Sequence, residues 1–126
     1  MIKFQEEAEA YMKTKRSDFT FDRYQNVAKE TAIYPQNVKV LYPALGLAGE
    51  AGEVANKVKK VVRDGVSKMP DDWKEQVGAE IGDVLWYCAA LASDLNISLA
   101  DCAMKNRDKL QSRMKRGKIS GTGDKR

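Results

Sequence analysis

Two pairs of carboxylates in this 126-residue chain have a spacing that suits metal binding. Glu50 and Glu53 are three residues apart, as are Glu80 and Asp83, and both pairs lie within the most apolar stretches of the sequence. Residues three apart share one face of a helix, so the charges of each pair would repel by roughly 3 kcal/mol at an effective dielectric near 20. At helical spacing, only Glu53 has a basic neighbour, Lys57. The pattern predicts a bound cation.

The absence of histidine from the sequence restricts the kind of cation. The chain cannot build a histidine-containing zinc site or a di-iron bundle of the Glu-x-x-His type, and it has no histidine general base. Its two cysteines, Cys88 and Cys102, are too few for a disulfide framework, and we expect them to be reduced core residues. The remaining chemistry depends on carboxylates, amines and a hard cation that prefers oxygen ligands.

A second candidate site is a polar strip near the C-terminus. Asn106 interrupts the apolar seam of a predicted helix, and Lys109 and Arg113 follow it at three and seven residues. From Lys105 onward nine basic residues face two acidic ones, a net charge of +7, in a chain whose total is +4. An amide and cations suit phosphate oxygens or a sugar hydroxyl. A solvated basic tail or a nonspecific nucleic-acid contact is the alternative, and the acid pairs make us favour ligand contact.

The elements that must position these residues are all predicted to be helices. We expect a short helix over residues 3–14, a second helix capped by Thr20 that ends before Tyr34, and a third from near Pro43 to about residue 63. A fourth begins after Pro70 and runs to about residue 95, and Ser98 caps a fifth that ends at residue 117. The third helix carries an apolar row, which consists of Ala44, Ala48, Ala51, Ala55, Val58 and Val62. Glycines in the third and fourth helices suggest that each helix has a close neighbour; they are Gly46, Gly49, Gly52, Gly78 and Gly82.

Composition and length indicate one compact domain. The chain is 43% hydrophobic and 32% charged, and it shows neither a secretory signal nor an apolar run long enough to cross a bilayer. We therefore expect a cytoplasmic protein, in the host cytoplasm if a phage encodes it. Helices with alanine and glycine faces bury little surface alone, so helices of a partner chain are expected to complete the core.

The acid pairs also resemble the motif of a known family. Glu50-Ala-Gly-Glu53 and Glu80-Ile-Gly-Asp83 are similar to the E-x-x-E and E-x-x-D pairs of the MazG-like, all-α nucleoside triphosphate pyrophosphohydrolases. The resemblance runs from about residue 21 to 117 and includes Tyr24-Gln25, residues 45–53, residues 83–87 and Asn106 with Lys109. Residues 116–126 resemble the end of the short, single-domain forms found in bacteria and their phages.

The resemblance implies a fold, a domain division and roles for individual residues. The fold would be an all-α bundle of about four main helices completed by dimerisation, with residues 1–17 an extension, 18–117 the catalytic domain and 118–126 a basic tail. Mg²⁺, or Mn²⁺ in its place, would be bound by Glu50, Glu53, Glu80 and Asp83. Nucleotide contacts would come from Asn106, Lys109 and Tyr87. Further candidates for contact with the base are Gln25, Trp73 and Trp86. Charge alone suggests that Arg113, Arg116 and Lys118 bind phosphates.

The activity that this resemblance implies is hydrolysis of ribo- or deoxyribonucleoside triphosphates to the monophosphate and pyrophosphate. Either Glu50 or Glu53 would orient or deprotonate the attacking water, since no histidine is available. A related enzyme for dUTP or phosphoribosyl-ATP is one alternative. A non-catalytic cation-binding protein with a nucleic-acid-binding end, or a plain interaction bundle, is another. We expect a homodimer or a dimer-based tetramer, with no membrane or nucleic-acid partner, and the base preference stays open.

Overall fold

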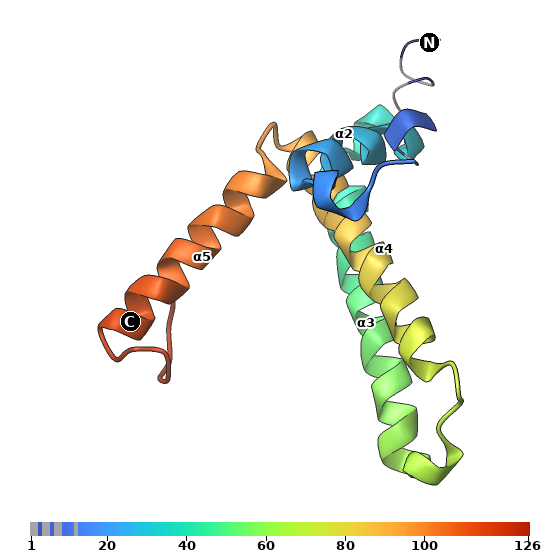
Figure 1. Cartoon of the computed structure of the whole chain (residues 1–126), viewed down its shortest axis with the longest axis vertical. Coiled ribbons are helices and arrows are strands. Elements are labelled where there is room, and N and C mark those ends of the chain that lie inside the picture. The colour runs from blue at the N-terminus through green and yellow to red at the C-terminus, as the bar shows by residue number, and fades with distance from the viewer. Residues whose placement is uncertain (1–2, 4–5, 7–8, 12) are drawn as a thin grey trace.

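Helices α3 (Leu41–Asp64) and α4 (Trp73–Asp94) form a long antiparallel hairpin in the computed structural model (Figure 1). The structure describes residues 3, 6, 9–11 and 13–126. The shorter α2 (Phe21–Thr31) lies across the open end of the hairpin, and α5 (Leu99–Lys115) starts there and runs away from it. Single 3-10 turns complete the element order: η1 (Arg16–Asp18), η2 (Gln36–Val38) and η3 (Val66–Lys68). The described residues contain no strand, so the predicted all-α class is confirmed.

The helix ends are fixed largely by local chemistry. The Thr20 hydroxyl accepts a hydrogen bond from the Arg23 amide at 3.2 Å, and the Ser98 hydroxyl accepts one from the Asp101 amide at 3.1 Å. Gly65 ends α3 with a φ of 90°. These predicted caps are confirmed. Residues 4, 5, 7, 8 and 12 of the helix predicted over residues 3–14 lie outside those described, and the described residues 3, 6 and 9–11 are helical.

Helix α3 begins two residues before the predicted Pro43, for a reason that lies elsewhere in the chain. Its N-cap, Val40, has a φ of 67°, which is unfavourable for a β-branched residue. The Val40 amide donates a 2.8 Å hydrogen bond to the Asp94 carboxylate at the far end of α4. That same carboxylate accepts a 2.8 Å hydrogen bond from the Tyr34 hydroxyl. A tertiary contact, which spacing along α3 does not reveal, therefore sets this helix start.

The face of α3 that packs on α4 is not the apolar row seen in the sequence. The packing face carries the fully buried Pro43 and the half-buried Leu47, Glu50, Val54, Lys57 and Val61. The whole alanine and valine row is exposed, with Val62 80% exposed. Of the helical glycines, only Gly46 has a close neighbour, because a Cβ there would collide with the Tyr87 ring. The expectation of tight contacts therefore holds at Gly46 and is wrong within this chain for the other four, which face open space.

The chain by itself has a small core and a large surface. Among the described residues, the buried hydrophobic ones are four alanines and Pro43. The accessible surface is 9747 Å², against about 6,700 Å² expected of a compact 14.1 kDa monomer. Exposed apolar side chains lie on α5, where Leu110 is 44% and Met114 64% exposed, and along the outer row of α3. None of the helices in the described part of the chain is both long enough and apolar enough to cross a membrane.

Candidate metal and nucleotide site

Three carboxylates from the two hairpin helices meet at the middle of the hairpin. Glu50 of α3 and Glu80 and Asp83 of α4 each offer an oxygen, and these oxygens all lie within 4.8 Å of one another. Glu50 and Glu80 are half-buried because they lie on the faces that pack together, whereas Asp83 is exposed. Glu53, one turn after Glu50, is exposed and lies outside this acid cluster of three.

The charges of this acid cluster are only partly balanced. Burial raises the pKa of Glu50, and the charges of Asp83, Glu80 and Glu53 and a hydrogen bond with Glu80 add to the increase. Lys57 forms a 3.2 Å ion pair with Glu80 from the opposite helix. The sequence suggested Glu53 as the partner of Lys57 and none for Glu80, and the structure corrects this assignment. One ammonium beside three carboxylates still leaves the site negative.

The acid cluster fits a hard divalent cation. Carboxylate oxygens are the ligands that Mg²⁺ prefers, and the ion usually retains several waters, so a few protein ligands suffice. Two oxygens bound to one Mg²⁺ are at most about 4.2 Å apart, since each lies about 2.1 Å from the ion. The observed spread of 4.8 Å would need only a small side-chain movement to close. Cysteine takes no part in the cluster, in keeping with a preference for oxygen ligands.

Aromatic side chains form a wall beside the acid cluster. The Tyr87 ring lies over Gly46, one turn before Glu50 on α3. Burial raises the pKa of Tyr87, and a hydrogen bond with Tyr42 and the nearby charges of Glu50 and Asp83 raise it further. Tyr42 lies 6.3 Å from Tyr87 between ring centroids and is 45% exposed. A planar group could therefore stack here, close to the carboxylates.

The aromatic wall is extended by two further ring pairs. Trp86 packs edge-on against Tyr87 with ring centroids 5.0 Å apart, and its indole nitrogen donates a 2.7 Å hydrogen bond to the Thr31 hydroxyl. Tyr34 stacks on Tyr42 at 4.7 Å. Because the N–H of Trp86 is already bonded to Thr31, any contact that Trp86 makes with a base would use its ring and not its donor.

Gln25 and Trp73 are also bonded to the protein itself. Gln25 is only 7% exposed, and its amide nitrogen donates to the Ser93 hydroxyl at 3.1 Å and the Ile97 carbonyl at 2.9 Å. Its amide oxygen accepts from the Leu99 amide at 2.8 Å. Gln25 thereby holds the turn between α4 and α5. The Trp73 indole donates to the Lys57 carbonyl at 3.2 Å and ties the two hairpin helices together.

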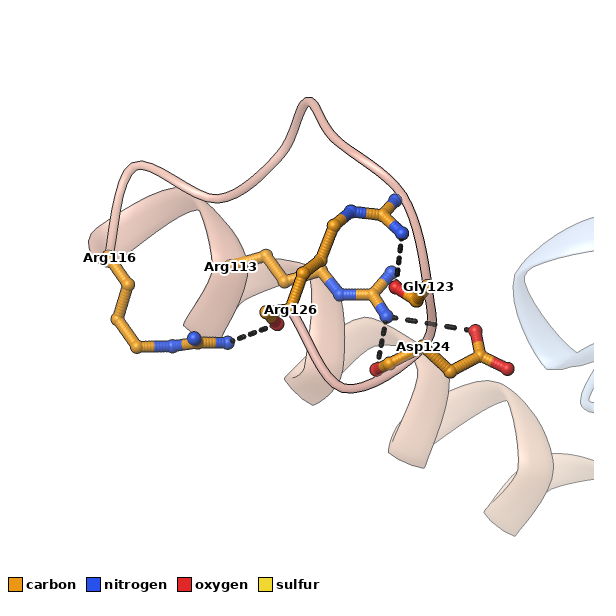
Figure 2. Close-up of polar contacts among 5 residues, drawn as sticks. All are labelled: Arg113, Arg116, Gly123, Asp124 and Arg126. Carbon is orange, nitrogen blue, oxygen red and sulfur yellow. Dashed lines mark hydrogen bonds and ion pairs between the residues drawn. The ribbon is translucent and has the colours of Figure 1, made fainter.

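The basic strip lies on α5 and in the segment after it. Asn106, Lys109 and Lys118 are exposed, and α5, which carries the first two, runs away from the hairpin (Figure 1). Figure 2 shows that the segment after α5 folds back over Arg113 and Arg116. Arg113, 4% exposed, donates to the Asp124 carbonyl at 2.6 Å, and Arg116 donates to the main-chain oxygen of Arg126 at 3.1 Å. Within one chain, the strip and the acid cluster are therefore not brought together.

Comparison with known proteins agrees with this arrangement of carboxylates. Residues 40–117 match the family described as the MazG nucleotide pyrophosphohydrolase domain. This chain belongs to the MazG family. It is also similar to the "Gene 37 protein" of Mycobacterium phage L5, with 46% identity over 111 residues that cover 83% of this chain and 97% of the relative. No solved structure matches the chain.

Several residues around the MazG acid cluster were given no role in the sequence analysis. Tyr42 lies on the same strip of α3 as Gly46 and Glu50, at successive intervals of four, and this spacing was a signal that could have identified it. Tyr24 approaches from α2, outside the matched MazG range. Burial raises its pKa, and the charge of Asp83 contributes. The ion pair between Lys57 and Glu80 could not be predicted from the sequence, because it depends on how α3 packs against α4.

Proposed function

We propose that this protein hydrolyses nucleoside triphosphates to the monophosphate and pyrophosphate, with Mg²⁺ bound by Glu50, Glu80 and Asp83. The observation that carries the proposal is the acid cluster, in which three carboxylates from two helices converge beside an aromatic wall. Membership of the MazG family supports a nucleotide as substrate. Mn²⁺ also accepts oxygen ligands and is expected to replace Mg²⁺.

Different residues of the chain are assigned different roles in this reaction. Mg²⁺, when bound, would neutralise phosphate charge and lower the pKa of water. Glu53 is exposed, lies outside the cluster and is one turn from Glu50, and we propose that it accepts the proton of the attacking water. Glu50 is the alternative base. The water oxygen bonds to the α-phosphorus, and the bond from that phosphorus to the bridging oxygen breaks, leaving its electron pair on pyrophosphate.

The aromatic wall is the proposed binding surface for the base or sugar. Tyr87 lies next to both Glu50 and Asp83, and Trp86 packs against it. Stacking on an aromatic ring does not by itself distinguish one base from another. Polar groups of Asn106 and Lys109 would then be needed for the sugar and phosphates.

A second copy of the chain is the proposed source of Asn106 and Lys109 at each site. In one chain, α5 runs away from the hairpin that carries the acid cluster (Figure 1), and Leu110 and Met114 of its apolar seam are exposed. The excess surface of roughly 3,000 Å² per chain is more than enough for an obligate homodimer, whose two partners together bury about 2,000–5,000 Å² or more. The open glycines of α3 and α4 would let another helix approach closely. We propose a homodimer, or a tetramer built from it.

The decisive experiment is pyrophosphate release from each ribo- and deoxyribonucleoside triphosphate with Mg²⁺, with Mn²⁺ and with EDTA. We expect metal-dependent release that EDTA abolishes. The same panel, extended to dUTP and phosphoribosyl-ATP, identifies the substrate. Absence of release from every nucleotide would refute the proposal, and salt-sensitive DNA binding in its place would favour the non-catalytic alternative.

A further inference from the structure

A pocket lies near the closed end of the α3/α4 hairpin. It has a volume of about 180 Å³, and the residues that line it include Lys57, Lys60, Lys68 and Trp73. Two of these lysines come from α3, the third comes from η3 in the connecting segment, and Trp73 is the first residue of α4. The connection between the two helices therefore brings three cations to one concave surface with an aromatic ring. We call this the lysine pocket.

The lysine pocket has an excess of positive charge. Asp64 is its one acidic wall residue, and both of its carboxylate oxygens are bonded to Arg63, at 2.6 and 2.8 Å. Within the part of the chain that the structure describes, neither Lys60 nor Lys68 forms an ion pair. Lys57 is the exception, since it is bonded to Glu80 of the acid cluster. Uncompensated ammonium groups around a cavity favour an anionic ligand.

The lysine pocket and the acid cluster are continuous along the hairpin. Lys57 lies seven residues after Glu50, and Trp73 lies seven residues before Glu80, so both are displaced by about 10 Å toward the closed end. The ammonium of Lys57 nevertheless reaches back to within 3.2 Å of Glu80. Lys57 thus joins the two sites, with carboxylates on one side and the other two lysines on the other.

We propose that the lysine pocket binds the pyrophosphate portion of the substrate, an inference that rests on the proposed function. A polyphosphate anchored at the acid cluster and extending toward the closed end meets Lys57 first and then Lys60 and Lys68. When Glu80 binds a cation, its attraction for Lys57 weakens, and the Lys57 ammonium turns to the phosphate oxygens. The lysines then stabilise the negative charge that gathers on pyrophosphate as the bond to the α-phosphorus breaks.

This assignment also sets the direction of the substrate along the hairpin. With the pyrophosphate toward the closed end, the nucleoside lies on the opposite side of the acid cluster. That side carries Tyr87 and Tyr42, the aromatic wall described above. Trp73 then borders the phosphates and not the base. The two surfaces flank the carboxylates from opposite ends, as a nucleoside triphosphate that is cut at its α-phosphorus requires.

The test is direct binding of inorganic pyrophosphate to the full chain, measured by calorimetry in EDTA so that neither metal nor hydrolysis contributes. The informative variant is the double substitution Lys60→Gln and Lys68→Gln, because these lysines contact no residue of the acid cluster. Loss of two charge-assisted contacts should raise the dissociation constant by about ten-fold or more. The matched control is Lys13→Gln with Lys29→Gln, two exposed lysines outside both proposed sites, which removes the same charge elsewhere and should leave binding unchanged.

The outcomes separate this inference from the proposed function. Absence of pyrophosphate binding, or equal weakening by the two double variants, overturns the lysine pocket even if nucleotides are hydrolysed. Binding that depends on Lys60 and Lys68 supports it, even if no nucleoside triphosphate is cut and the proposed function fails. In the active protein, the Lys60 and Lys68 variant should also lose inhibition by added pyrophosphate, whereas the control pair should retain it.

Discussion

The α3/α4 hairpin and the α5 arm contain similar side chains but use them differently. In the hairpin, half-buried charged groups face one another across two helices, and Lys57 pairs with Glu80 beside the remaining acids. In the arm, the apolar seam faces solvent, and Arg113 and Arg116 are bonded to the main chain of their own C-terminal segment (Figure 2). One chain therefore brings the acid cluster together and holds the basic strip apart from it.

This difference indicates which features belong to the single chain and which require a second one. Carboxylates held within 4.8 Å of each other repel, and a cation bound between them would relieve this cost in free energy. Exposed Leu110 and Met114 cost free energy that another apolar surface would relieve. Under the proposed function, a bound cation would complete the hairpin site, and a second copy of the chain would cover the arm.

The largest effect is expected from removing a carboxylate of the acid cluster in the hairpin. Glu80→Gln or Asp83→Asn removes one metal ligand, and loss of outer-shell partners alone costs such sites 10–100-fold, so a direct ligand should cost about 1,000-fold or more in Mg²⁺-dependent pyrophosphate release. Circular dichroism should show unchanged helix content. Glu75→Gln, an exposed change in the first turn of α4, is the matched control and should keep full activity. Retained turnover in both ligand variants would remove the acid cluster from the mechanism.

Association through the α5 arm is tested by placing a charge in its apolar seam. Leu110→Asp would bury an unpaired carboxylate in each copy of a symmetric interface, so association should weaken by at least about 100-fold. Sedimentation equilibrium measures this effect, and activity at low protein concentration should fall with it. Gln111→Asp introduces the same charge beside the seam and should leave both properties unchanged. A wild-type protein that sediments as a monomer at all concentrations would instead show that the arm functions alone.

The junction between the two regions depends on Gln25. Gln25→Leu removes the three hydrogen bonds to Ser93, Ile97 and Leu99, so buried polar groups at the turn from α4 to α5 lose their partner. We expect a loss of about 2 kcal/mol in the free energy of unfolding, measured with urea. Asn26→Leu, one residue along and exposed, is the control. Equal stability of the two variants would mean that Gln25 does not fix the direction of the arm.

Helix ends and the acid pairs could be predicted from the sequence, because they depend on neighbours along the chain. Thr20, Ser98 and Gly65 mark helix ends by local hydrogen bonds or backbone conformation, and each lies where predicted. The E-x-x-E and E-x-x-D spacing gave the acids, because residues three apart share a helix face whatever the helix packs against.

Features that depend on the rotation of one helix against another could not be predicted in this way. The apolar row of α3 suggested a packing face, but the face that contacts α4 is the one with Glu50 and Lys57. The pairing of Lys57 with Glu80 arises across the interface, where intervals of three and four carry no information. The direction of α5 depends on the Gln25 hydrogen bonds to a turn more than 65 residues away.

The smallest effect is expected where the hairpin meets the segment before it, at Tyr34. Burial, together with the hydrogen bond and charge of Asp94, raises the pKa of Tyr34 to about 12 from the usual 10.0. Because the folded-state pKa lies above the unfolded one, the hydroxyl stabilises the fold fully below pH 10, and this contribution is lost as the pH rises through 12. Tyr34→Phe should therefore lower the free energy of unfolding by about 1 kcal/mol at pH 7. Urea titrations of both proteins at increasing pH should show the difference shrinking above pH 10, and a difference that stayed constant to pH 12 would mean that the Asp94 contact does not hold Tyr34 in its neutral form.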